Sequence, residues 1–181
     1  MGTPGGATST RMKGWLKLHS WGPLSTLGSC LAILVFAADR AFKWWMLDVV
    51  DIARTQPIRL SPFLSLVLAW NTGVSYGWFA QDTVSGQIVF AAIGLAASLG
   101  LWAWLARTTQ ALTAASIGLI IGGALGNALD RVIYHSVADF FLLHAFGYSW
   151  YVFNLADIAI VAGVALLIYE SIGENRQKAR V

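Results

Sequence analysis

The sequence predicts a mainly α-helical integral membrane protein, with four transmembrane helices and a small outer-face β-sheet, a cradle, between the first and second helices. Of the 181 residues, 57% are hydrophobic and only 12% are charged, whereas a soluble domain has about 45–50% apolar and about 25% charged residues. The apolar residues form four runs of about the 20 residues that a spanning helix needs. A further apolar stretch, FLSLVLAW, is too short to span and stops at Asn-Thr-Gly, which favours a strand and a turn.

The runs divide the chain into spans and connections. The four expected spans are, in order, residues 21–45, 88–106, 111–129 and about 153–169. The first ends in the pair Trp44 and Trp45, which suits the headgroup region of a bilayer. We therefore expect a cytoplasmic, disordered N-terminal tail (1–20), a single membrane domain (21–171) and a cytoplasmic C-terminal tail (172–181).

Two connections are long. Residues 48–86 contain two prolines and several charges, which indicates a solvent-side excursion, and the predicted strand 63–70 with its turn at Asn71-Thr72-Gly73 lies within it. Residues 130–152 are expected to form a loop between the third and fourth spans. The turn at 108–110, between the second and third spans, is short.

Three glycines, Gly118, Gly122 and Gly126, recur every fourth residue in the third span. This spacing places them on one helix face and lets a neighbouring helix approach closely. The alternative is ordinary enrichment of glycine in membrane helices.

The charges favour one orientation. Four spans put both termini on the same side, where seven basic residues lie against five on the other side. The positive-inside rule then makes both termini cytoplasmic. All seven aspartates fall on the outer side, so we expect the function there. Basic residues do not form a stripe interleaved with aromatics, which argues against nucleic acid as a partner.

Polar side chains gather at the outer ends of the spans and in the outer connections. They are Asp39, Lys43, Asn71, Asn127, Asp130, Arg131, Asp139, Asn154 and Asp157. Charged groups at membrane depth cost about 2.5–3.5 kcal/mol each on insertion scales, so such groups usually have a function. Because helix ends fix their depth, we expect these side chains to converge.

Each of these residues also has a structural interpretation. Asp130 and Arg131 would form a plain interfacial ion pair, and Lys43 would extend to the headgroups or pair with Asp39 four residues earlier. Asn154 would be only the N-cap of the fourth helix, and Asp157 would be favoured in its first turn by the helix dipole.

Two chemistries are disfavoured by the residues available. The three histidines and the single cysteine show no metal-ligand spacing, so we expect neither a metal nor a cofactor. A Gly-x-Ser-x-Gly elbow is absent, which disfavours a serine nucleophile. Paired carboxylates remain: two close aspartates share one proton, so that one activates water while the other donates to a carbonyl oxygen. Burial against lipid raises the proton affinity of these carboxylates, while the helix N-terminus beside Asp157 lowers it, so the sequence leaves open which of the two is ionised.

The blocks NTGVSYGWF, GNALDRVIYHSVADF and FNLAD, with Asp39, Lys43 and Trp45 in the first span, resemble the signature blocks of lipoprotein signal peptidase (signal peptidase II), a bacterial inner-membrane aspartyl protease. The resemblance covers residues 39–157 and implies cleavage of a prolipoprotein signal peptide just before a diacylglyceryl-modified cysteine. It implies that Asp139 and Asp157 are the catalytic pair. The residues to which we assign substrate-binding or supporting roles are Asp39, Lys43, Asn71, Gly73, Asn127, Asp130, Arg131 and Asn154.

The partners implied are a lipidated prolipoprotein and membrane lipid, and we expect a monomer. The chain departs from the family pattern at Arg40 (usually Gln), His135 (usually Gly), Tyr151 (usually Pro) and Ile158 (usually small and polar). The alternatives from other classes are a small transporter or proton-coupled channel and a non-catalytic lipid-binding scaffold. The absence of an inverted repeat between the halves argues against the first.

Overall fold

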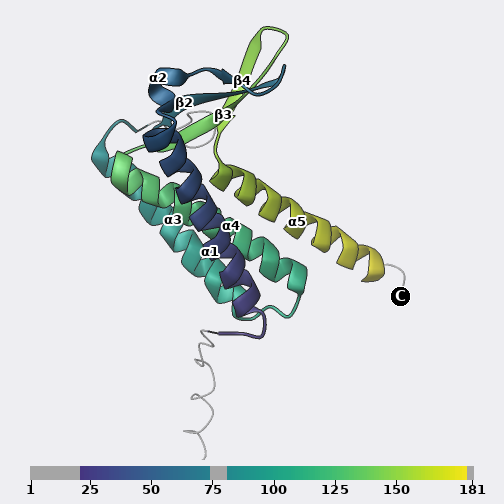
Figure 1. Ribbon diagram of the computed structural model, residues 1–181. Coiled ribbons are helices and arrows are strands. Elements are labelled where there is room, and N and C mark those ends of the chain that lie inside the picture. Colours follow the sequence, from purple (N-terminus) through teal and green to yellow (C-terminus); the bar gives the residue numbers. More distant parts are fainter. Residues whose placement is uncertain (1–20, 74–80, 179–181) are drawn as a thin grey trace, which may run out of the picture.

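The computed structural model describes residues 21–73 and 81–178 and has four long helices with a small sheet at one end (Figure 1). The first of them is continued by a π-helical turn, η1 (Trp45–Val49), and is followed by a short helix, α2 (Ile52–Thr55). The four long helices are α1 (Ser25–Trp44), α3 (Val84–Leu105), α4 (Ala111–Tyr134) and α5 (Leu155–Lys178). Each contains a segment long and apolar enough to cross a membrane. The predicted fold class, four transmembrane helices with a small sheet, is confirmed.

The helix limits differ from the expected spans most at the ends of α5 and α4. Helix α5 continues to Lys178, about nine residues beyond its predicted end and into the predicted C-terminal tail, and the second difference is in α4. This helix continues to Tyr134, five residues beyond the predicted end, and stops where His135 adopts a left-handed conformation (φ 56°). The two charged residues Asp130 and Arg131 are therefore helical and lie on its final turns. The uncharged run marked the apolar part of α4 but not its end, because a helix can leave the apolar layer before it terminates.

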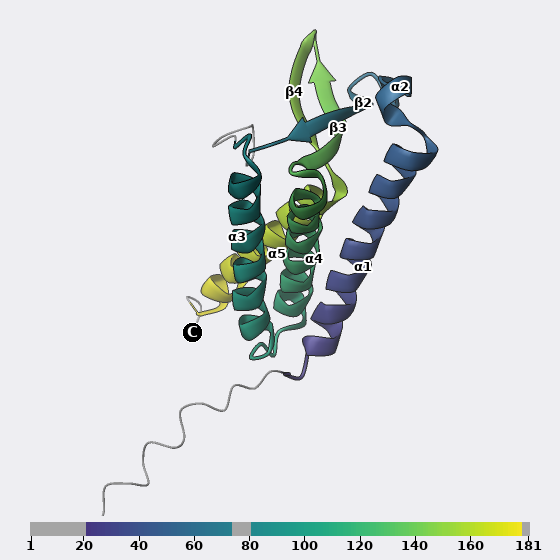
Figure 2. The same cartoon turned by 90° about the vertical axis from the view of Figure 1, so that its left-hand side faces the viewer.

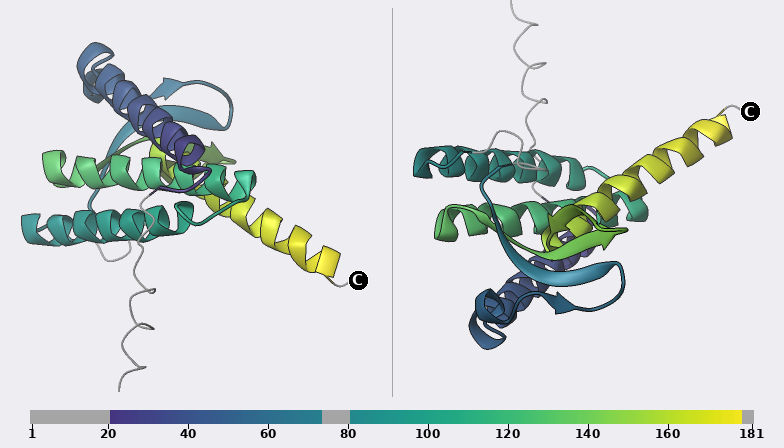
Figure 3. Two further views of the ribbon diagram at one scale, coloured as in Figure 1. Left: turned by 90° about the horizontal axis from the view of Figure 1, so that it is seen from below. Right: turned by 90° about the horizontal axis from the view of Figure 1, so that it is seen from above.

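Helix α4 is central, with α1 and α3 on opposite sides and α5 crossing behind it (Figure 3). A Cβ atom added to Gly122 would lie 2.5 Å from the carbonyl oxygen of Ala32 on α1, and one added to Gly118 would meet the backbone of Gly28. The prediction that this glycine face admits a neighbouring helix is confirmed, and the neighbour is α1. On another face of α4, Gly123 approaches the backbone of Ala156 on α5 in the same way.

The sheet lies across one end of the helices (Figure 2) and has four antiparallel strands in the order β1-β2-β3-β4. The strands are β1 (Ile58–Arg59), β2 (Leu64–Asn71), β3 (Val137–Ala145) and β4 (Tyr148–Phe153). The predicted strand 63–70 is β2. The hairpin predicted at Asn71-Thr72-Gly73 would run into residues 74–80, outside the described residues.

Half of the sheet comes from a region that we expected to be a loop. Strands β3 and β4 occupy the segment between α4 and α5, so the sheet is not confined to the connection between the first two spans. Aromatic and β-branched residues, which favour strands, make up five of the six residues of β4 but only three of the nine of β3. The Phe146-Gly147 turn between them has positive φ at both positions (53° and 83°), as two-residue hairpin turns of type I′ require.

A small apolar core fixes the sheet to the end of α1. It contains Met46, Ile52, Leu66, Ala138 and Phe140, all buried. Because side chains alternate along a strand, the packing of Ala138 and Phe140 into this core turns Asp139 toward the opposite face of β3.

Candidate active site

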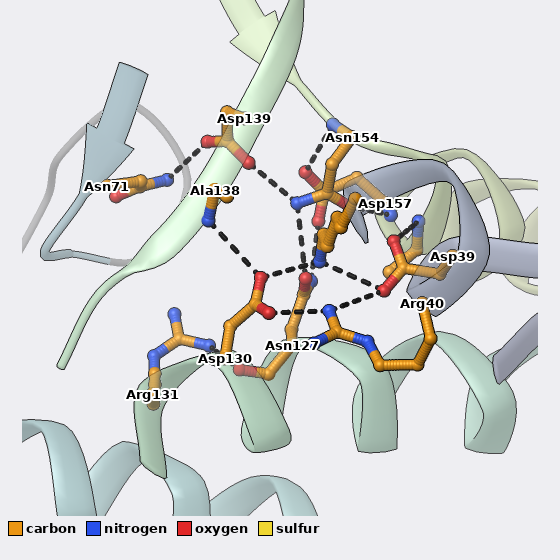
Figure 4. A network of polar contacts seen from close by, with 12 residues as sticks. Asp39, Arg40, Asn71, Asn127, Asp130, Arg131, Ala138, Asp139, Asn154 and Asp157 are labelled. Carbon is orange, nitrogen blue, oxygen red and sulfur yellow. Dashed lines mark hydrogen bonds and ion pairs between the residues drawn. The ribbon is translucent and has the colours of Figure 1, made fainter. Parts of the chain in front are cut away.

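The polar residues predicted to converge do so where the sheet meets the ends of α4 and α5 (Figure 4). Asp139 comes from β3 and Asp157 from the first turn of α5. Asn71 ends β2, Asn127 lies on α4 and Asn154 directly precedes α5. The site thus joins two strands and two helices that are far apart in the sequence.

Three asparagine side chains link the two carboxylates. Asn71 donates its amide N–H to Oδ2 of Asp139 (3.1 Å), and Asn154 donates to Oδ1 of the same carboxylate (2.6 Å). Asn127 donates to Oδ1 of Asp157 (2.8 Å), and Asn154 also donates to the side-chain oxygen of Asn127 (3.1 Å). The hydrogen-bond donors on this pair of carboxylates are therefore neutral amides.

Asn154 both caps helix α5 and contacts a carboxylate of the site. Its Oδ1 accepts the backbone N–H of Asp157 (2.9 Å), and Asp157 Oδ2 accepts the backbone N–H of Asn154 (3.3 Å). This reciprocal pair has the geometry of a capping box and satisfies free N–H groups at the start of α5. Because the acceptor oxygen of Asn154 caps the helix, its amide nitrogen is free to bind Asp139.

The carboxyl group of Asp139 has a pKa raised to about 7. Burial is the main cause, and the negative charge of Asp157 adds to it, while hydrogen bonds from Asn71 and Asn154 and the charge of Lys43 act in the opposite direction. Asp139 is therefore a carboxyl group that holds a proton close to neutral pH.

A second group of charges lies beside the carboxylate pair. Lys43 Nζ is 2.9 Å from Asp39 Oδ2 and 2.6 Å from Asp130 Oδ2. Lys43 is only 1% exposed, so it does not extend to the headgroups, and the predicted pair with Asp39 is confirmed. The expected ion pair between Asp130 and Arg131 does not form among the described residues: Asp130 bonds instead to Lys43 and Arg40.

Arg131 connects α4 to the end of β2. Its Nη2 donates to the carbonyl oxygen of Gly73 (2.9 Å) and its Nη1 to that of Asn127 (3.2 Å). Gly73 in turn donates its N–H to the side chain of Asn71 (2.9 Å), and the Arg131 guanidinium lies 5.6 Å from the Phe90 ring centre. Arg131 and Gly73 therefore support the position of Asn71.

Sequence reasoning missed three residues that belong to the site. Arg40 pairs with both Asp39 and Asp130, although it was noted only as a departure from a family pattern. Gln87 is fully buried and donates to the carbonyl oxygens of Thr72 and Gln81, which fixes both residues beside the start of α3. A lone glutamine at the start of an apolar span was the available signal.

The third missed residue, Tyr151, lies between two cavities. One cavity of about 520 Å³ is lined by Asp157, Asn127 and Arg131 and continues along apolar residues of α3, α4 and α5. A second, of about 330 Å³, is lined by Asp139 and by parts of β2 and β4. Asn71 and Tyr151 line both cavities, so each carboxylate faces a different cavity across a shared boundary.

A metal site is not evident at this position. No group of three or more His, Cys, Asp or Glu side chains with the arrangement of metal ligands occurs within residues 21–73 and 81–178. The three asparagines beside the two carboxylates turn their amide N–H groups toward them and so act as donors to anions in the described contacts.

Known proteins are similar to this chain over most of its length. Residues 31–173 match the signal peptidase (SPase) II family. The lipoprotein signal peptidase of Nitrobacter hamburgensis is 50% identical over 148 residues, 80% of this chain and 90% of that protein. That of Methylocella silvestris is 51% identical over 150 residues, 83% of this chain and 88% of that protein.

A solved structure supports the same assignment. A bacterial membrane enzyme determined by the in meso method at 2.3 Å resolution superposes with a TM-score of 0.68 and 26% identity, over 84% of this chain and 92% of that one. The family match contains Asp139 and Asp157, all of α3 and α4, and most of α1 and α5. This protein is a multi-pass bacterial membrane protein and belongs to the signal peptidase II family.

Proposed function

We propose that the protein is an aspartyl endopeptidase that removes the signal peptide from diacylglyceryl-modified prolipoproteins, by cleavage before the lipidated cysteine. The observation that carries this proposal is the pair Asp139 and Asp157, held by asparagine amides at the edge of the membrane domain. The names of the relatives, lipoprotein signal peptidases, support the substrate class.

The two carboxylates have different roles in the proposed reaction. Asp139, whose pKa is raised to about 7, holds a proton and donates it to the carbonyl oxygen of the scissile bond. Asp157, in the first turn of α5, is assigned the role of base, because the backbone N–H of Asn154 and the helix N-terminus support a negative charge there. It takes a proton from water, and the resulting hydroxide attacks the carbonyl carbon.

The intermediate then collapses. The carbon–nitrogen bond breaks, and the proton that Asp157 received passes to the leaving amine of the cysteine, while Asp139 recovers its proton from the former carbonyl oxygen. Atoms and charges balance with water as the only co-substrate, so the step needs no cofactor.

The two cavities suit the two halves of the substrate. The larger one runs from Asp157 along Gly94, Ala124 and Val161, within the membrane-spanning helices, and suits an apolar signal helix and acyl chains. Arg131 at its polar end offers a rigid guanidinium for a carbonyl or ester oxygen. The smaller cavity beside Asp139 lies on the sheet, outside the spans, and suits the residues after the cysteine.

In this arrangement the scissile bond crosses the boundary between the two cavities, where Asn71 and Tyr151 lie. A peptide bond that reaches both carboxylates has to pass there, because Asp157 lines one cavity and Asp139 the other. Asn71 also binds Asp139, so it is suited to hold the substrate and the acid together.

The protein is proposed to lie in the inner membrane as a monomer, with both termini cytoplasmic and the active site on the outer face. The support is the excess of basic residues on the terminal side, seven against five. The test is labelling of introduced cysteines in a Cys30→Ala background, because Cys30 is exposed on α1. Labelling from outside should reach positions 51 and 144 and not 108; labelling at 108 in intact cells would reverse the orientation.

The activity is tested with purified protein in detergent and a prolipoprotein with and without its diacylglyceryl group. Only the lipidated form should yield a shorter product, which begins at the lipidated cysteine by mass spectrometry, and added chelator should leave the rate unchanged. Equal cleavage of both forms would contradict the substrate class, and no cleavage would reopen the transporter interpretation.

A further inference from the structure

The residue before each catalytic aspartate donates its backbone N–H to a further aspartate. The N–H of Ala138, the residue before Asp139, donates to Asp130 Oδ2 (3.2 Å). The N–H of Ala156, the residue before Asp157, donates to Asp39 Oδ1 (3.2 Å). The two supporting aspartates thus fix the two backbone segments that carry the pair.

The supporting aspartates are bridged twice by cations. Lys43 Nζ lies within 2.9 Å of Asp39 and 2.6 Å of Asp130. Arg40 Nη2 lies 2.9 Å from Asp39 Oδ2 and 2.5 Å from Asp130 Oδ1. We call these four residues the buried quartet; its two carboxylates are fully buried and its two cations balance them.

We infer that Arg40 is a positioning residue, which together with Lys43 sets the separation of Asp139 and Asp157 by holding Asp39 and Asp130 together. The inference rests on the proposed function only in taking Asp139 and Asp157 as catalytic. Arg40 touches neither of them among the described contacts and acts through the two backbone N–H groups.

The physical reason is charge balance. Asp39 belongs to α1 and Asp130 to α4, and each holds one half of the site. Without Arg40 a single cation, Lys43, would face two buried carboxylates, which would lose a shared partner and would repel each other more strongly. This change moves Ala138 relative to Ala156, and reacting groups tolerate little displacement: a shift of about 1 Å can cost about a hundredfold in rate.

Exposure distinguishes the two cations and guides the choice of variant. The Lys43 side chain is 2% exposed and that of Arg40 is 20% exposed, so Arg40 lies on the more exposed side of the quartet. Replacement of Arg40 by glutamine removes the charge, shortens the side chain by two bonds and keeps a polar amide. Glutamine is also usual at this position in the family that the sequence resembles, so Arg40→Gln is expected to fold.

The kinetic test compares Arg40→Gln and Arg40→Lys with Arg54→Gln as the matched control, because Arg54 is 87% exposed and pairs only with the partly exposed Asp51. Arg40→Gln should lower kcat roughly tenfold with KM within about twofold, since the groups displaced act on the reacting bond rather than on binding. Arg40→Lys should retain most of kcat. An unchanged kcat, or a raised KM with kcat unchanged, would overturn the inference.

A second measurement does not depend on activity. Hydrogen exchange at the amides of Ala138 and Ala156 should be faster in Arg40→Gln than in the parent, and unchanged in Arg54→Gln. If exchange rises as expected but the parent cleaves no lipidated substrate, the proposed function fails and the positioning role stands. If the parent cleaves and exchange at both amides is unaffected, the positioning role is wrong and the function stands.

Discussion

The site contains two pairs of aspartates that share a residue type and differ in their partners. Asp39 and Asp130 are neutralised by Lys43 and Arg40, at 2.5–2.9 Å. Asp139 and Asp157 bind only asparagine amides and a backbone N–H through the described side-chain contacts. The first pair faces cations inside the protein, and the second pair lines the two cavities.

This difference in partners indicates a structural role for the first pair and a role in proton transfer for the second. A carboxylate held between two cations is fixed in position by both of them, so it serves as an anchor. A carboxylate surrounded by neutral donors keeps a proton affinity set by burial and by its neighbour, as the raised pKa of Asp139 shows. Amides orient the carboxylate without neutralising it, which is what proton transfer to a substrate requires.

The largest expected effect is on catalysis. Asp139→Asn and Asp157→Asn should each lower kcat by at least about 10²–10⁴-fold, because asparagine neither accepts the proton of water nor supplies an acidic one. The double variant should be little worse than either single variant, since the two act as a unit. Asp48→Asn, at an exposed position, is the control for rate measurements on lipidated substrate. Near-parental cleavage by either single variant would remove the pair from the mechanism.

Substitution in the anchoring pair, Asp39 and Asp130, should reduce stability more than it reduces activity. Asp130→Asn leaves Arg40 and Lys43 with an excess of buried positive charge, and breaking a buried ion pair from one side typically costs about 3–5 kcal/mol. We expect a marked loss in the free energy of unfolding, measured in detergent, and partial activity in the folded fraction. Asp51→Asn, whose ion pair with Arg54 is exposed, should change stability little. Equal stability of these two variants would mean that the quartet does not anchor the site.

The pH dependence should reflect Asp139. We expect kcat/KM to fall above about pH 7, where the raised pKa of Asp139 is passed and its donated proton is lost. We expect the pH–rate profile to be bell-shaped, and its two apparent pKa values belong to the carboxylate pair as a whole. A profile that stays flat to pH 9 would contradict Asp139 as the acid.

The same pKa shift has a consequence for stability. A carboxyl whose folded pKa lies above its unfolded value contributes stability below the unfolded value, and this contribution is lost as pH rises through about 7. Asp139→Asn should therefore be at least as stable as the parent at pH 8, by thermal unfolding, and lose less stability between pH 4 and pH 8. A variant clearly less stable at pH 8 would assign Asp139 a structural role.

The smallest effect concerns the packing that brings the quartet together. In Gly122→Ala the added Cβ would lie 2.5 Å from the Ala32 carbonyl oxygen and 2.8 Å from Val35 Cβ, so α1 and α4 have to separate slightly. We expect a loss of about 1–3 kcal/mol in stability, typical of overpacking. Gly100→Ala on α3, with no atom within 4 Å of the added group, is the control and should be neutral or slightly stabilising. Similar stabilities of the two variants would show that α1 does not pack closely there.

Much of the architecture follows from local sequence. Apolar length alone located the four spans, and the glycine spacing in α4 marked the face on which α1 packs. The residues grouped around the active site were also predictable, because helix ends fix the depth of Asp39, Asn127, Asp130 and Asp157 along the membrane normal. Depth, however, is one coordinate out of three.

The tertiary structure determined where these side chains lie within the plane of the membrane and which groups they contact. Strands β3 and β4 became part of the sheet because β2, more than sixty residues earlier in the chain, offers them an edge and a shared core. Asp130 pairs with Arg40 rather than with adjacent Arg131, because consecutive residues on a helix point in different directions. The sequence determined which chemical groups reach the outer end of the helices; only folding determined which carboxylates meet cations and which meet amides, because ion pairs and hydrogen bonds act over a few ångströms between segments distant in sequence.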